Sequence, residues 1–282
     1  MIPHNYFYYW SGQKFQYVHL LSVLSVLKQC DVKRIEIHVE EVPKNNSYWK
    51  KVGAIERVDI VPLDVRSLMG LAGLKYADYA HFLSNGGVNH KSDFIRYLLL
   101  AVYGGVYLDF DTLVVKNLGP LLDVEFFAGR QKRDIWGNDI NGAIMGSRKD
   151  GDLILKCISK VRNLRRFGRT GTIKDLEVLF NKLLMPNRYR WAEAGPCLLT
   201  KLVREKQFAG TVYPIEYFQF WHHEHWQEIF SPGHLDERIY VIHHYGSRSM
   251  KETEKIDEKN IWYTHSVFAD AARKMLETQT SV

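Results

Sequence analysis

Short runs of β-branched and aromatic residues alternate with a helix-length segment at the start of the chain. The runs lie at residues 5–10, 32–39 and 55–63, and FQYVHLLSVLSVLKQC, between the first two, is long and apolar enough for a buried helix. Strands that alternate with helices pack as a largely parallel sheet covered by those helices. The sequence therefore predicts an α/β fold.

The rest of the chain continues this pattern less regularly. Residues 92–103 predict a helix that Ser92 caps and that Gly104 and Gly105 end, and the strand GGVYLDFDTLVV follows directly. Further strands are expected at FFAGR, GAIMGS and RIYVIHH, and further helices at 152–165, 173–184, 198–206 and 261–277. No linker rich in proline, glycine or serine interrupts the chain. We therefore expect a single domain.

Composition and charge are those of an ordinary globular protein. Hydrophobic residues make up 46% of the chain and charged residues 25%, which argues against disorder. The net charge of +6 fits an anionic ligand, a nucleic acid or a membrane surface, and it does not choose among them.

The cysteines and the N-terminal residues indicate the cellular compartment in which the protein is expected. Cys30, Cys157 and Cys197 are scattered and form no C-x-x-C pair, which argues against a disulfide framework and fits a reducing compartment. The first ten residues do not resemble a signal peptide, and the longest apolar stretch is too short to cross a bilayer. We expect a cytoplasmic protein with no transmembrane segment.

Two aspartates interrupt the hydrophobic run at residues 104–115. Asp109 and Asp111 flank Phe110, and strand alternation would put both carboxylates on the face of Tyr107, away from the core. An unpaired buried charge is costly. Paired carboxylates, however, supply the oxygen ligands that Mg²⁺ and Mn²⁺ prefer, and a bound cation would offset that cost.

The spacing of this pair is weak evidence by itself, because 16 aspartates in 282 residues give about one such match by chance. A second pair, Asp150 and Asp152, lies at a turn into a helix, where helix capping is expected. Asp109 and Asp111 differ because they follow a helix and a Gly-Gly turn. Ligands of α/β sheets bind at the carboxyl ends of such strands.

The wider segment HKSDFIRYLLLAVYGGVYLDFDTLVVKNL, residues 90–118, resembles the sugar-nucleotide signature of glycosyltransferase family 32. That signature combines Ser-Asp, an Arg three residues later, a Leu-rich helix, Gly-Gly and two aspartates one residue apart. Glucosylating domains of clostridial toxins and yeast-type initiating mannosyltransferases share it. The resemblance implies a GT-A fold, which is Rossmann-like with a mostly parallel central sheet flanked by helices.

The resemblance also implies how the chain is organised and what it binds. Residues 1–282 would form one GT-A domain, with a nucleotide-sugar-binding half at 1–145. The acceptor-side half, 146–282, would include a C-terminal loop for metal and phosphate. The cofactor would be Mn²⁺ or Mg²⁺, and the donor a nucleoside-diphosphate sugar, with a UDP-sugar favoured over a GDP-sugar.

By this resemblance, donor and metal contacts come from the signature itself. Asp111 would bind the cation, and Asp109 would contact the cation, the ribose or the donor sugar. Asp93 and Arg96, with Ser92 beside them, would hold donor-sugar hydroxyls, and Arg96 could also help to neutralise the diphosphate. The residues expected to act in catalysis are Asp93, Arg96 and Asp111. The alternative for Asp93 and Arg96 is a simple intrahelical ion pair.

Two segments outside the signature also resemble the family. In FYYWSG, Tyr9 and Trp10 would form a wall against the nucleotide base, with Gly12 keeping the turn open. In NDINGAIMGS, Asn141 would touch the donor sugar. A core role for Trp10 and a turn-forming role for Asn141 are the alternatives.

A third segment, VIHHYGSRSM, resembles the His-His-aromatic stretch of the family. Strand alternation allows only one of His243 and His244 to face the site, and the His directly before the aromatic residue completes the metal shell in related enzymes. This implies His244 as the third metal ligand. The segment departs from the family at Met250, where a Trp is expected.

The resulting hypothesis is metal-dependent transfer of a sugar to a hydroxyl of a glycan or glycoconjugate, with retained anomeric configuration. An inverting enzyme would need a general base, for which Glu193 or a residue in 216–225 is a candidate. The segment FQFWHHEHWQ could form an acceptor surface, simple packing, or a second metal site of His222, His223 and His225. The alternatives are a metal-dependent phosphoesterase or nuclease, or a non-catalytic protein that binds sugar or nucleic acid. We expect no nucleic-acid partner.

Overall fold

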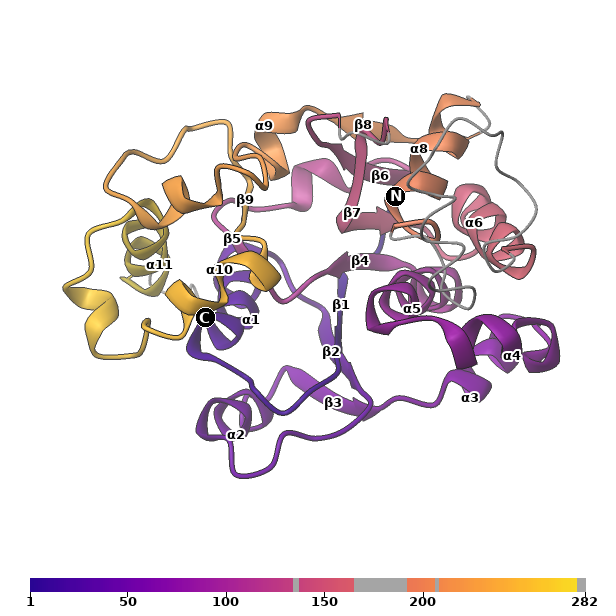
Figure 1. Cartoon of the computed structure of the whole chain (residues 1–282), viewed down its shortest axis with the longest axis horizontal. Coiled ribbons are helices and arrows are strands. Elements are labelled where there is room, and N and C mark those ends of the chain that lie inside the picture. The colour runs from indigo at the N-terminus through magenta and orange to yellow at the C-terminus, as the bar shows by residue number, and fades with distance from the viewer. Residues whose placement is uncertain (134–136, 165–191, 206–207, 278–282) are drawn as a thin grey trace, which may run out of the picture.

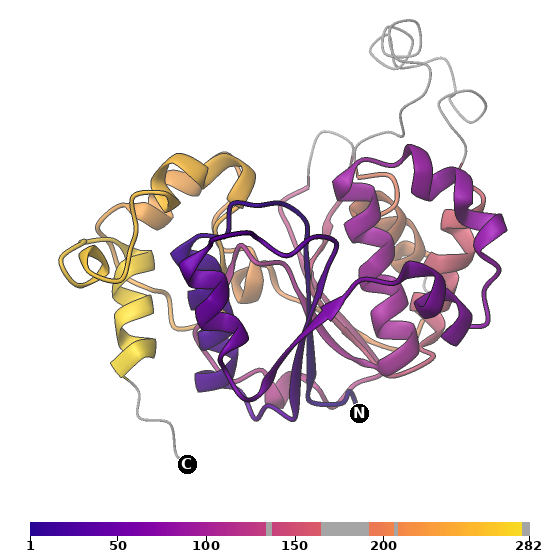
Figure 2. The same ribbon diagram turned by 90° about the horizontal axis from the view of Figure 1, so that it is seen from below.

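A seven-stranded sheet forms the centre of the structure, with helices on both of its faces (Figures 1 and 2). The structure is a computed structural model that describes residues 1–133, 137–164, 192–205 and 208–277. The strands lie in the order β3 (Val58–Pro62), β2 (Arg34–Val39), β1 (Asn5–Trp10), β4 (Gly105–Leu108), β7 (Ile140–Ser147), β6 (Phe126–Arg130) and β8 (Thr211–Tyr213). Within this sheet β7 alone runs against the other strands. The predicted α/β fold with a mostly parallel sheet is confirmed.

The helices form two layers, which Figure 2 shows on either side of the strands. One layer consists of α1 (Tyr17–Gln29), α2 (Ser47–Gly53) and α11 (Val267–Glu277). The other consists of α3 (Val65–Leu71), α4 (Tyr76–Asn85), α5 (Val88–Tyr103), α6 (Asp152–Arg162) and α8 (Pro196–Arg204). Each layer encloses its own cluster of buried apolar side chains against the sheet. Burial of these two clusters is the main driving force for the fold.

A second, two-stranded sheet connects distant parts of the chain. It pairs β5 (Thr112–Val114) antiparallel with β9 (Val241–His243). Short helices surround it: η1 (Gly119–Leu121), α9 (Ile215–Phe218), η2 (Trp226–Phe230), α10 (Gly246–Thr253) and η3 (Asn260–Trp262). The pairing places the histidines at the end of β9 beside the turn that contains Asp109 and Asp111.

The single strand expected over residues 104–115 is wrong, because the chain leaves one sheet for the other at the aspartates. β4 ends at Leu108 and β5 begins at Thr112. In the turn between them, the Thr112 hydroxyl donates to the carbonyl of Asp109 at 2.7 Å, and the Asp109 amide donates to the carbonyl of Ala143 in β7 at 2.8 Å. Both carboxylates therefore project from a turn.

The helix expected at 92–103 begins earlier than predicted, because Gly87 is the N-cap of α5. Ser92 therefore lies inside the helix and does not cap it. The helix ends as predicted at Gly104, with φ of 65°. At Gly105, with φ of 136°, a Cβ would lie 2.4 Å from the carbonyl oxygen of Asn5, so only glycine allows β4 to approach β1 here.

Other boundaries differ at the ends of elements. The predicted helix at 152–165 ends at Arg162 with Gly151 as its N-cap, so the capping role expected for Asp150 and Asp152 is wrong. The predicted helix at 261–277 is divided into η3 and α11. The predicted helix at 173–184 lies outside the described residues.

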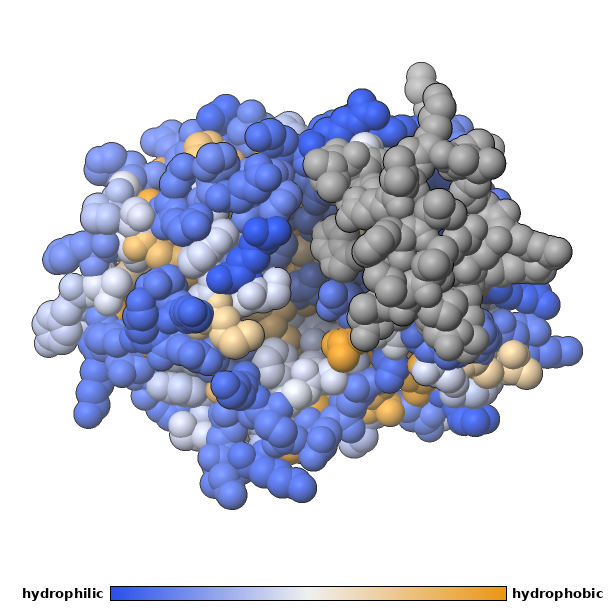
Figure 3. Space-filling model, viewed as in Figure 1, coloured by the Kyte–Doolittle hydropathy of each residue, from blue (hydrophilic) through white to orange (hydrophobic). Residues whose placement is uncertain are grey.

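Hydrophilic side chains cover most of the face shown in Figure 3. The apolar residues of the described chain are concentrated in the two clusters on either side of the sheet. Among the described residues, no helix combines the length and the apolar character needed to cross a membrane.

Candidate functional site

Arg96 lies at the centre of a buried polar cluster formed by α5 and the turn after β4. Its Nη2 donates to Oδ1 of Asp109 at 3.2 Å and to Oγ of Ser92 at 3.1 Å, while Nη1 lies 3.4 Å from Oδ1 of Asp93. The guanidinium carbon is 4.9 Å from the centre of the Tyr107 ring, whose hydroxyl donates to Asp109 at 3.0 Å. The structure thus brings together four residues that the sequence assigned to the donor site.

The charges in this cluster shift one another's pKa values. Burial would lower the pKa of Arg96, but the carboxylates of Asp109 and Asp93 raise it. Burial raises the pKa of Asp93 to about 6, against the opposing effect of Arg96 and with the help of Asp109. Burial also raises the pKa of Asp109, which Arg96 opposes and Asp111 reinforces. Arg96 therefore serves the buried carboxylate of Asp93 and the partly exposed carboxylate of Asp109 with a single positive charge.

Two glycines allow neighbouring elements to approach this cluster. A Cβ at Gly195, just before α8, would lie 2.4 Å from Oδ1 of Asp93, and a Cβ at Gly142 in β7 would lie 2.6 Å from Nη1 of Arg96. The Tyr97 hydroxyl holds the segment before α8 by donating to the carbonyl of Ala194 at 2.8 Å. Neither glycine could be singled out from local sequence, because their close contacts arise only from the packing of distant segments. Glu193, a candidate base, lies two residues before Gly195.

Asp111 faces the C-terminal histidines. Its Oδ2 accepts a hydrogen bond from the amide of Gly246 at 2.7 Å and lies 3.3 Å from Nε2 of His243. Burial would raise the pKa of Asp111, but His243, His244 and the Gly246 amide lower it well below its usual value. Its other oxygen, Oδ1, is buried and has no hydrogen-bond partner among the described residues.

Of the two histidines, His243 has its ring against the Asp111 carboxylate, whereas His244 contacts Asp111 through its backbone amide, which donates to the Asp111 carbonyl at 2.9 Å. β9 ends at His243, and Tyr245 has a left-handed backbone with φ of 55°, so strand alternation does not extend to His244. The sequence analysis considered His243 but chose His244 as the ligand. Its Nδ1 is 3.0 Å from Oε1 of Gln219, which leaves Nε2 directed at Asp111.

The environments of the two histidines differ. Burial would lower the pKa of His243, but the charges of Asp111 and Asp109 raise it. Burial, with His243 adding to its effect, lowers the pKa of His244 to about 4. The His244 ring lies 5.6 Å from that of Phe268, and its Nδ1 is 2.9 Å from the Ser249 hydroxyl. Nε2 of His244 is buried without a hydrogen-bond partner in the described part of the chain.

Asp111, His243 and His244 supply the donor types that a divalent cation takes, although their ligand atoms do not all lie within 4.8 Å of one another in the described chain. A buried carboxylate oxygen of Asp111 and a buried ring nitrogen of His244 lack partners among residues 1–133, 137–164, 192–205 and 208–277, and a second imidazole lies beside the same carboxylate. Unsatisfied buried polar atoms of this kind call for a ligand. Carboxylate oxygens suit Mg²⁺ and Mn²⁺, and an added imidazole suits a transition metal. The donor set therefore fits Mn²⁺ at least as well as Mg²⁺.

The expected base-binding wall is corrected by the structure. Trp10 belongs to the α1 layer, with its ring 4.7 Å from that of His19 and 5.2 Å from that of Phe110, whereas Tyr9 is buried in the α5 layer. Consecutive residues of a strand point to opposite faces, so the two side chains do not form one surface. The Trp10 ring nitrogen donates to the carbonyl of Gly12 at 2.8 Å. A contact of either ring with a nucleotide base stays a prediction.

His19 was not recognised from the sequence, and it lies close to the metal-binding candidates. Burial lowers its pKa to about 3, with His244 adding to this effect and Asp111 opposing it. Its Nδ1 accepts a hydrogen bond from the amide of Gln16 at 2.9 Å, which fixes the ring at the start of α1. A neutral imidazole is thus held near Asp111.

Asn141 lies within β7, so the turn-forming alternative is wrong. Its side-chain nitrogen donates to Oε1 of Gln131 at 2.8 Å, and its oxygen accepts from the amide of Ala143 at 2.7 Å. Ala143 in turn accepts from the amide of Asp109. Asn141 therefore shapes the strand edge beside the aspartate turn, and its contact with a donor sugar stays a prediction.

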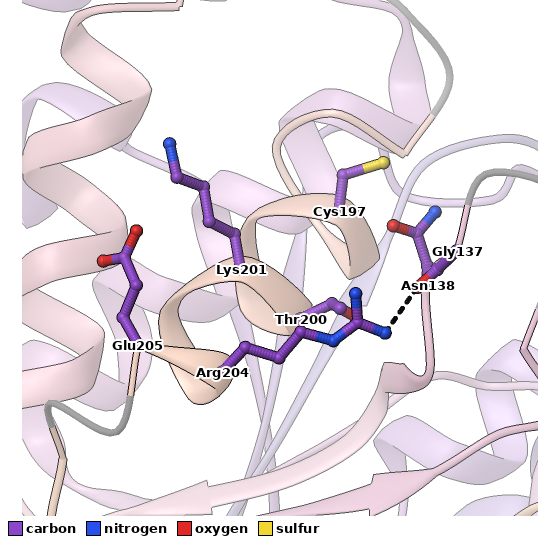
Figure 4. A pocket seen from close by; sticks show the side chains of 7 residues that line it. All are labelled: Gly137, Asn138, Cys197, Thr200, Lys201, Arg204 and Glu205. Carbon is purple, nitrogen blue, oxygen red and sulfur yellow. Dashed lines mark hydrogen bonds between the residues drawn. The ribbon is translucent and has the colours of Figure 1, made fainter.

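A pocket of about 400 Å³ lies along α8 (Figure 4). Its lining consists of Gly137, Asn138, Cys197, Thr200, Lys201, Arg204 and Glu205. Arg204 is already engaged, because it donates to the carbonyl of Gly137 at 2.8 Å and lies 3.2 Å from the carboxylate of Asp139. None of the aspartates or histidines described above lines this pocket, so it is separate from the candidate site.

Comparison with known proteins places the cluster in context. Residues 28–128, which include α5 and the aspartate turn, match the model of a family described as glycosyltransferase sugar-binding region containing a DXD motif. An uncharacterized glycosyltransferase of Acanthamoeba polyphaga mimivirus, L373, is 46% identical over 59 residues, which cover 21% of this chain and 23% of the relative. Lactosylceramide 4-alpha-galactosyltransferase of Rattus norvegicus is 23% identical over 197 residues, which cover 67% of this chain and 47% of the relative.

Among solved structures, the PaToxG glycosyltransferase is 18% identical, with a TM-score of 0.49 over 73% of this chain and 70% of that one. The chain spans less than half the length of the two curated relatives.

Proposed function

Because residues 28–128 of this chain belong to the family of glycosyltransferase sugar-binding regions containing a DXD motif, we propose that the chain transfers a sugar from a nucleoside-diphosphate sugar to a hydroxyl of a glycan or glycoconjugate. The observation that carries the proposal is the meeting of Asp109, Asp111 and His243 with the Arg96 cluster at the junction of the two sheets. This arrangement offers carboxylate and imidazole groups for a cation beside a buried guanidinium for an anion.

Each residue of the cluster has a distinct task in this proposal. Asp111, His243 and His244 would hold the cation, and Arg96 would fix Asp109 while sharing its charge with the donor. Asp93, held 3.4 Å from Arg96, would accept hydrogen bonds from donor-sugar hydroxyls. A bound divalent cation would supply Lewis-acid stabilisation of the departing diphosphate.

The proposed reaction breaks the bond between the anomeric carbon and the diphosphate oxygen, whose electron pair leaves with the diphosphate. A new bond forms between the acceptor oxygen and the anomeric carbon, and the proton of the acceptor hydroxyl passes to the departing diphosphate. We propose that the configuration is retained, with attack on the face that the diphosphate leaves. Holding both substrates in this geometry and excluding water would supply much of the rate enhancement.

We propose His243 as a metal ligand in addition to the sequence-based candidate His244. Its ring nitrogen lies 3.3 Å from Oδ2 of Asp111, and its pKa responds to both aspartates of the turn. His244 is packed against Phe268, and its pKa responds to Asp111 but not to Asp109. Measurement of Mn²⁺ affinity in His243→Ala and His244→Ala would rank the two, and we expect the larger loss in His243→Ala.

The proposal also names a donor, an acceptor to be screened and a cellular compartment. We favour a UDP-sugar with Mn²⁺. Lactosylceramide belongs in the acceptor screen because the rat relative is named for it, and free lactose is the matched control without the lipid. We keep the cytoplasm as the proposed compartment; its support is that no disulfide joins Cys30, Cys157 and Cys197 in the described part of the chain.

A thermal-shift screen of UDP- and GDP-sugars with and without Mn²⁺ tests the donor and metal together. A ligand present at 100 times its Kd stabilises the folded state by about 2.7 kcal/mol. We expect stabilisation that requires Mn²⁺ and that Asp111→Asn abolishes while the variant stays folded. Equal stabilisation of wild type and Asp111→Asn would exclude the metal-ligand role of Asp111.

Product analysis separates transfer from the alternative reactions. Release of the nucleoside diphosphate should accompany glycosylation of the acceptor. Cleavage of phosphate esters without any glycosylated product would instead support a phosphoesterase. Binding of the donor without turnover of any acceptor would support a non-catalytic sugar-binding protein.

A further inference from the structure

The loop between α9 and η2 gathers three potential metal-binding side chains. One ligand atom from each of His222, His223 and Glu224 lies within 4.8 Å of the other two. The two imidazole rings are 3.9 Å apart, and Nδ1 of His222 lies 3.2 Å from Oε2 of Glu224. His225, which the sequence suggested as a third ligand, turns away, because its Nδ1 pairs with Glu228 at 3.6 Å.

His222 is the least satisfied member of this group. Only 13% of its side chain is exposed; Nδ1 faces the Glu224 carboxylate, and Nε2 makes no hydrogen bond to any described residue. A buried ring nitrogen without a partner is unfavourable, and a bound cation would offset this cost.

We propose that His222, His223 and Glu224 form a second divalent-cation site, of the zinc class, in addition to the site at Asp111. Two imidazoles and one carboxylate are a ligand set that zinc accepts, and three protein ligands leave a fourth position open to water or to a substrate group. The Asp111 site is richer in carboxylate and suits Mn²⁺ or Mg²⁺. The two sites therefore differ in the cation that they prefer.

The position of this second site connects it with the first. The same loop contains Gln219 and Trp221, whose side-chain oxygen and backbone carbonyl lie 2.8 Å and 2.6 Å from the Tyr245 hydroxyl. The His223 ring is 6.3 Å from that of Tyr245. A cation on His222 and His223 would fix the loop that orients His243 through Gln219.

Metal titration of the full chain tests the proposal without measuring activity. We expect chelator-treated wild type to bind two equivalents of Co²⁺, one of which gives the visible absorption of a four-coordinate site with nitrogen ligands. His222→Ala and His223→Ala should lose that equivalent and its absorption. Asp111→Asn should keep that absorption. His225→Ala is the matched control, because this histidine lies on the same loop but outside the group, and it should behave as wild type.

The fold of each variant is checked by Mn²⁺ binding at the Asp111 site. A variant that keeps Mn²⁺ binding but loses the Co²⁺ absorption supports the second site. If His222→Ala and His223→Ala bind as much Co²⁺ as wild type, with the same spectrum, the proposal is wrong. An equal loss in His225→Ala would also overturn it, since the ligand would then be a nonspecific cluster of histidines.

Discussion

At the scale of single residues, Asp93 shows a conflict between stability and function. The carboxylate is 6% exposed, and burial raises its pKa from the ordinary value of 3.8 to about 6. A carboxyl whose pKa is higher in the folded state destabilises that state when it is ionised. The loss of folding stability caused by ionised Asp93 is absent below about pH 4. It grows as the pH rises from there to about 6, and it is complete above that pH.

Asp93→Asn should therefore make the protein more stable at pH 8, by at most about 3 kcal/mol. At pH 4 most of the gain should vanish, because the folded wild-type carboxyl is then protonated. Urea unfolding of both proteins from pH 4 to pH 8 measures this difference. A variant that is less stable than wild type at pH 8 would show that the ion pair with Arg96 outweighs the cost of burial. We also expect the variant to lose donor binding, since Asp93 is a proposed donor contact.

Gln219 is a positioning residue at the same scale. It is 2% exposed, and its Oε1 lies within hydrogen-bond distance of both Nδ1 of His243 and the Tyr245 hydroxyl. Residues that orient a metal-binding histidine typically change metal affinity by about 10-fold to 100-fold when replaced. Gln219→Leu should weaken Mn²⁺ binding by about that factor.

Gln219→Glu is the matched control, because a carboxylate oxygen can accept both hydrogen bonds. It should retain most of the Mn²⁺ affinity, as measured by electron paramagnetic resonance of free Mn²⁺. Equal affinity in wild type and Gln219→Leu would mean that Gln219 only supports the loop. An equal loss of Mn²⁺ affinity in Gln219→Leu and Gln219→Glu would mean that the packing of Gln219, and not its hydrogen bonds, affects Mn²⁺ binding.

At the scale of elements, the sequence was informative where local pattern and final structure agree. β1 and β6 were predicted with their observed bounds, since each is an apolar run between clear turns. The helix, Gly-Gly turn and aspartate pair were also recognisable, because they are consecutive in the chain. The break between β4 and β5 was not predictable from periodicity, since it depends on β9, which lies more than 100 residues later. The choice between His243 and His244 was not predictable either, since strand alternation ends with β9 at His243.

Gly195 illustrates a contact between elements that only the fold reveals. A Cβ there would lie within 2.4–2.6 Å of the Asp93 carboxyl group, which is itself buried and unable to yield. Gly195→Ala should destabilise the protein by about 1–3 kcal/mol, as overpacking does. It should also reduce the thermal shift that the donor produces, because Asp93 is displaced.

Gly70→Ala is the control for this substitution. Gly70 lies in α3, and a Cβ added there would meet no heavy atom of a neighbouring element within 4 Å, so alanine should be neutral or stabilise by up to about 1 kcal/mol. Thermal melts of both variants, with and without donor, provide the comparison. A Gly195→Ala protein with wild-type stability and donor response would show that the start of α8 moves freely, contrary to its tie to Tyr97.

At the scale of the whole molecule, the division at residue 145 does not coincide with the packing. The cluster around α1 combines Tyr8 and Val106 with Phe268 from the C-terminal part, and the cluster around α5 combines Phe94 with Leu199. In the described part of the chain, each cluster therefore takes side chains from both halves. The two halves should therefore unfold together, in keeping with the prediction of one domain.

Phe268→Ala tests this cooperativity. Phe268 is 1% exposed, with its ring 5.5 Å from that of Phe230 and 5.6 Å from that of His244, so truncation should cost about 3–5 kcal/mol. In a cooperative molecule, far-ultraviolet circular dichroism and tryptophan fluorescence follow a single transition. Both probes should shift to lower urea by the same amount, even though α5 and its cluster lie on the other face of the sheet. A second transition left at the wild-type urea concentration would instead mean that the α5 layer is stable without the α1 layer, and the single domain would have to be divided between the two layers of helices.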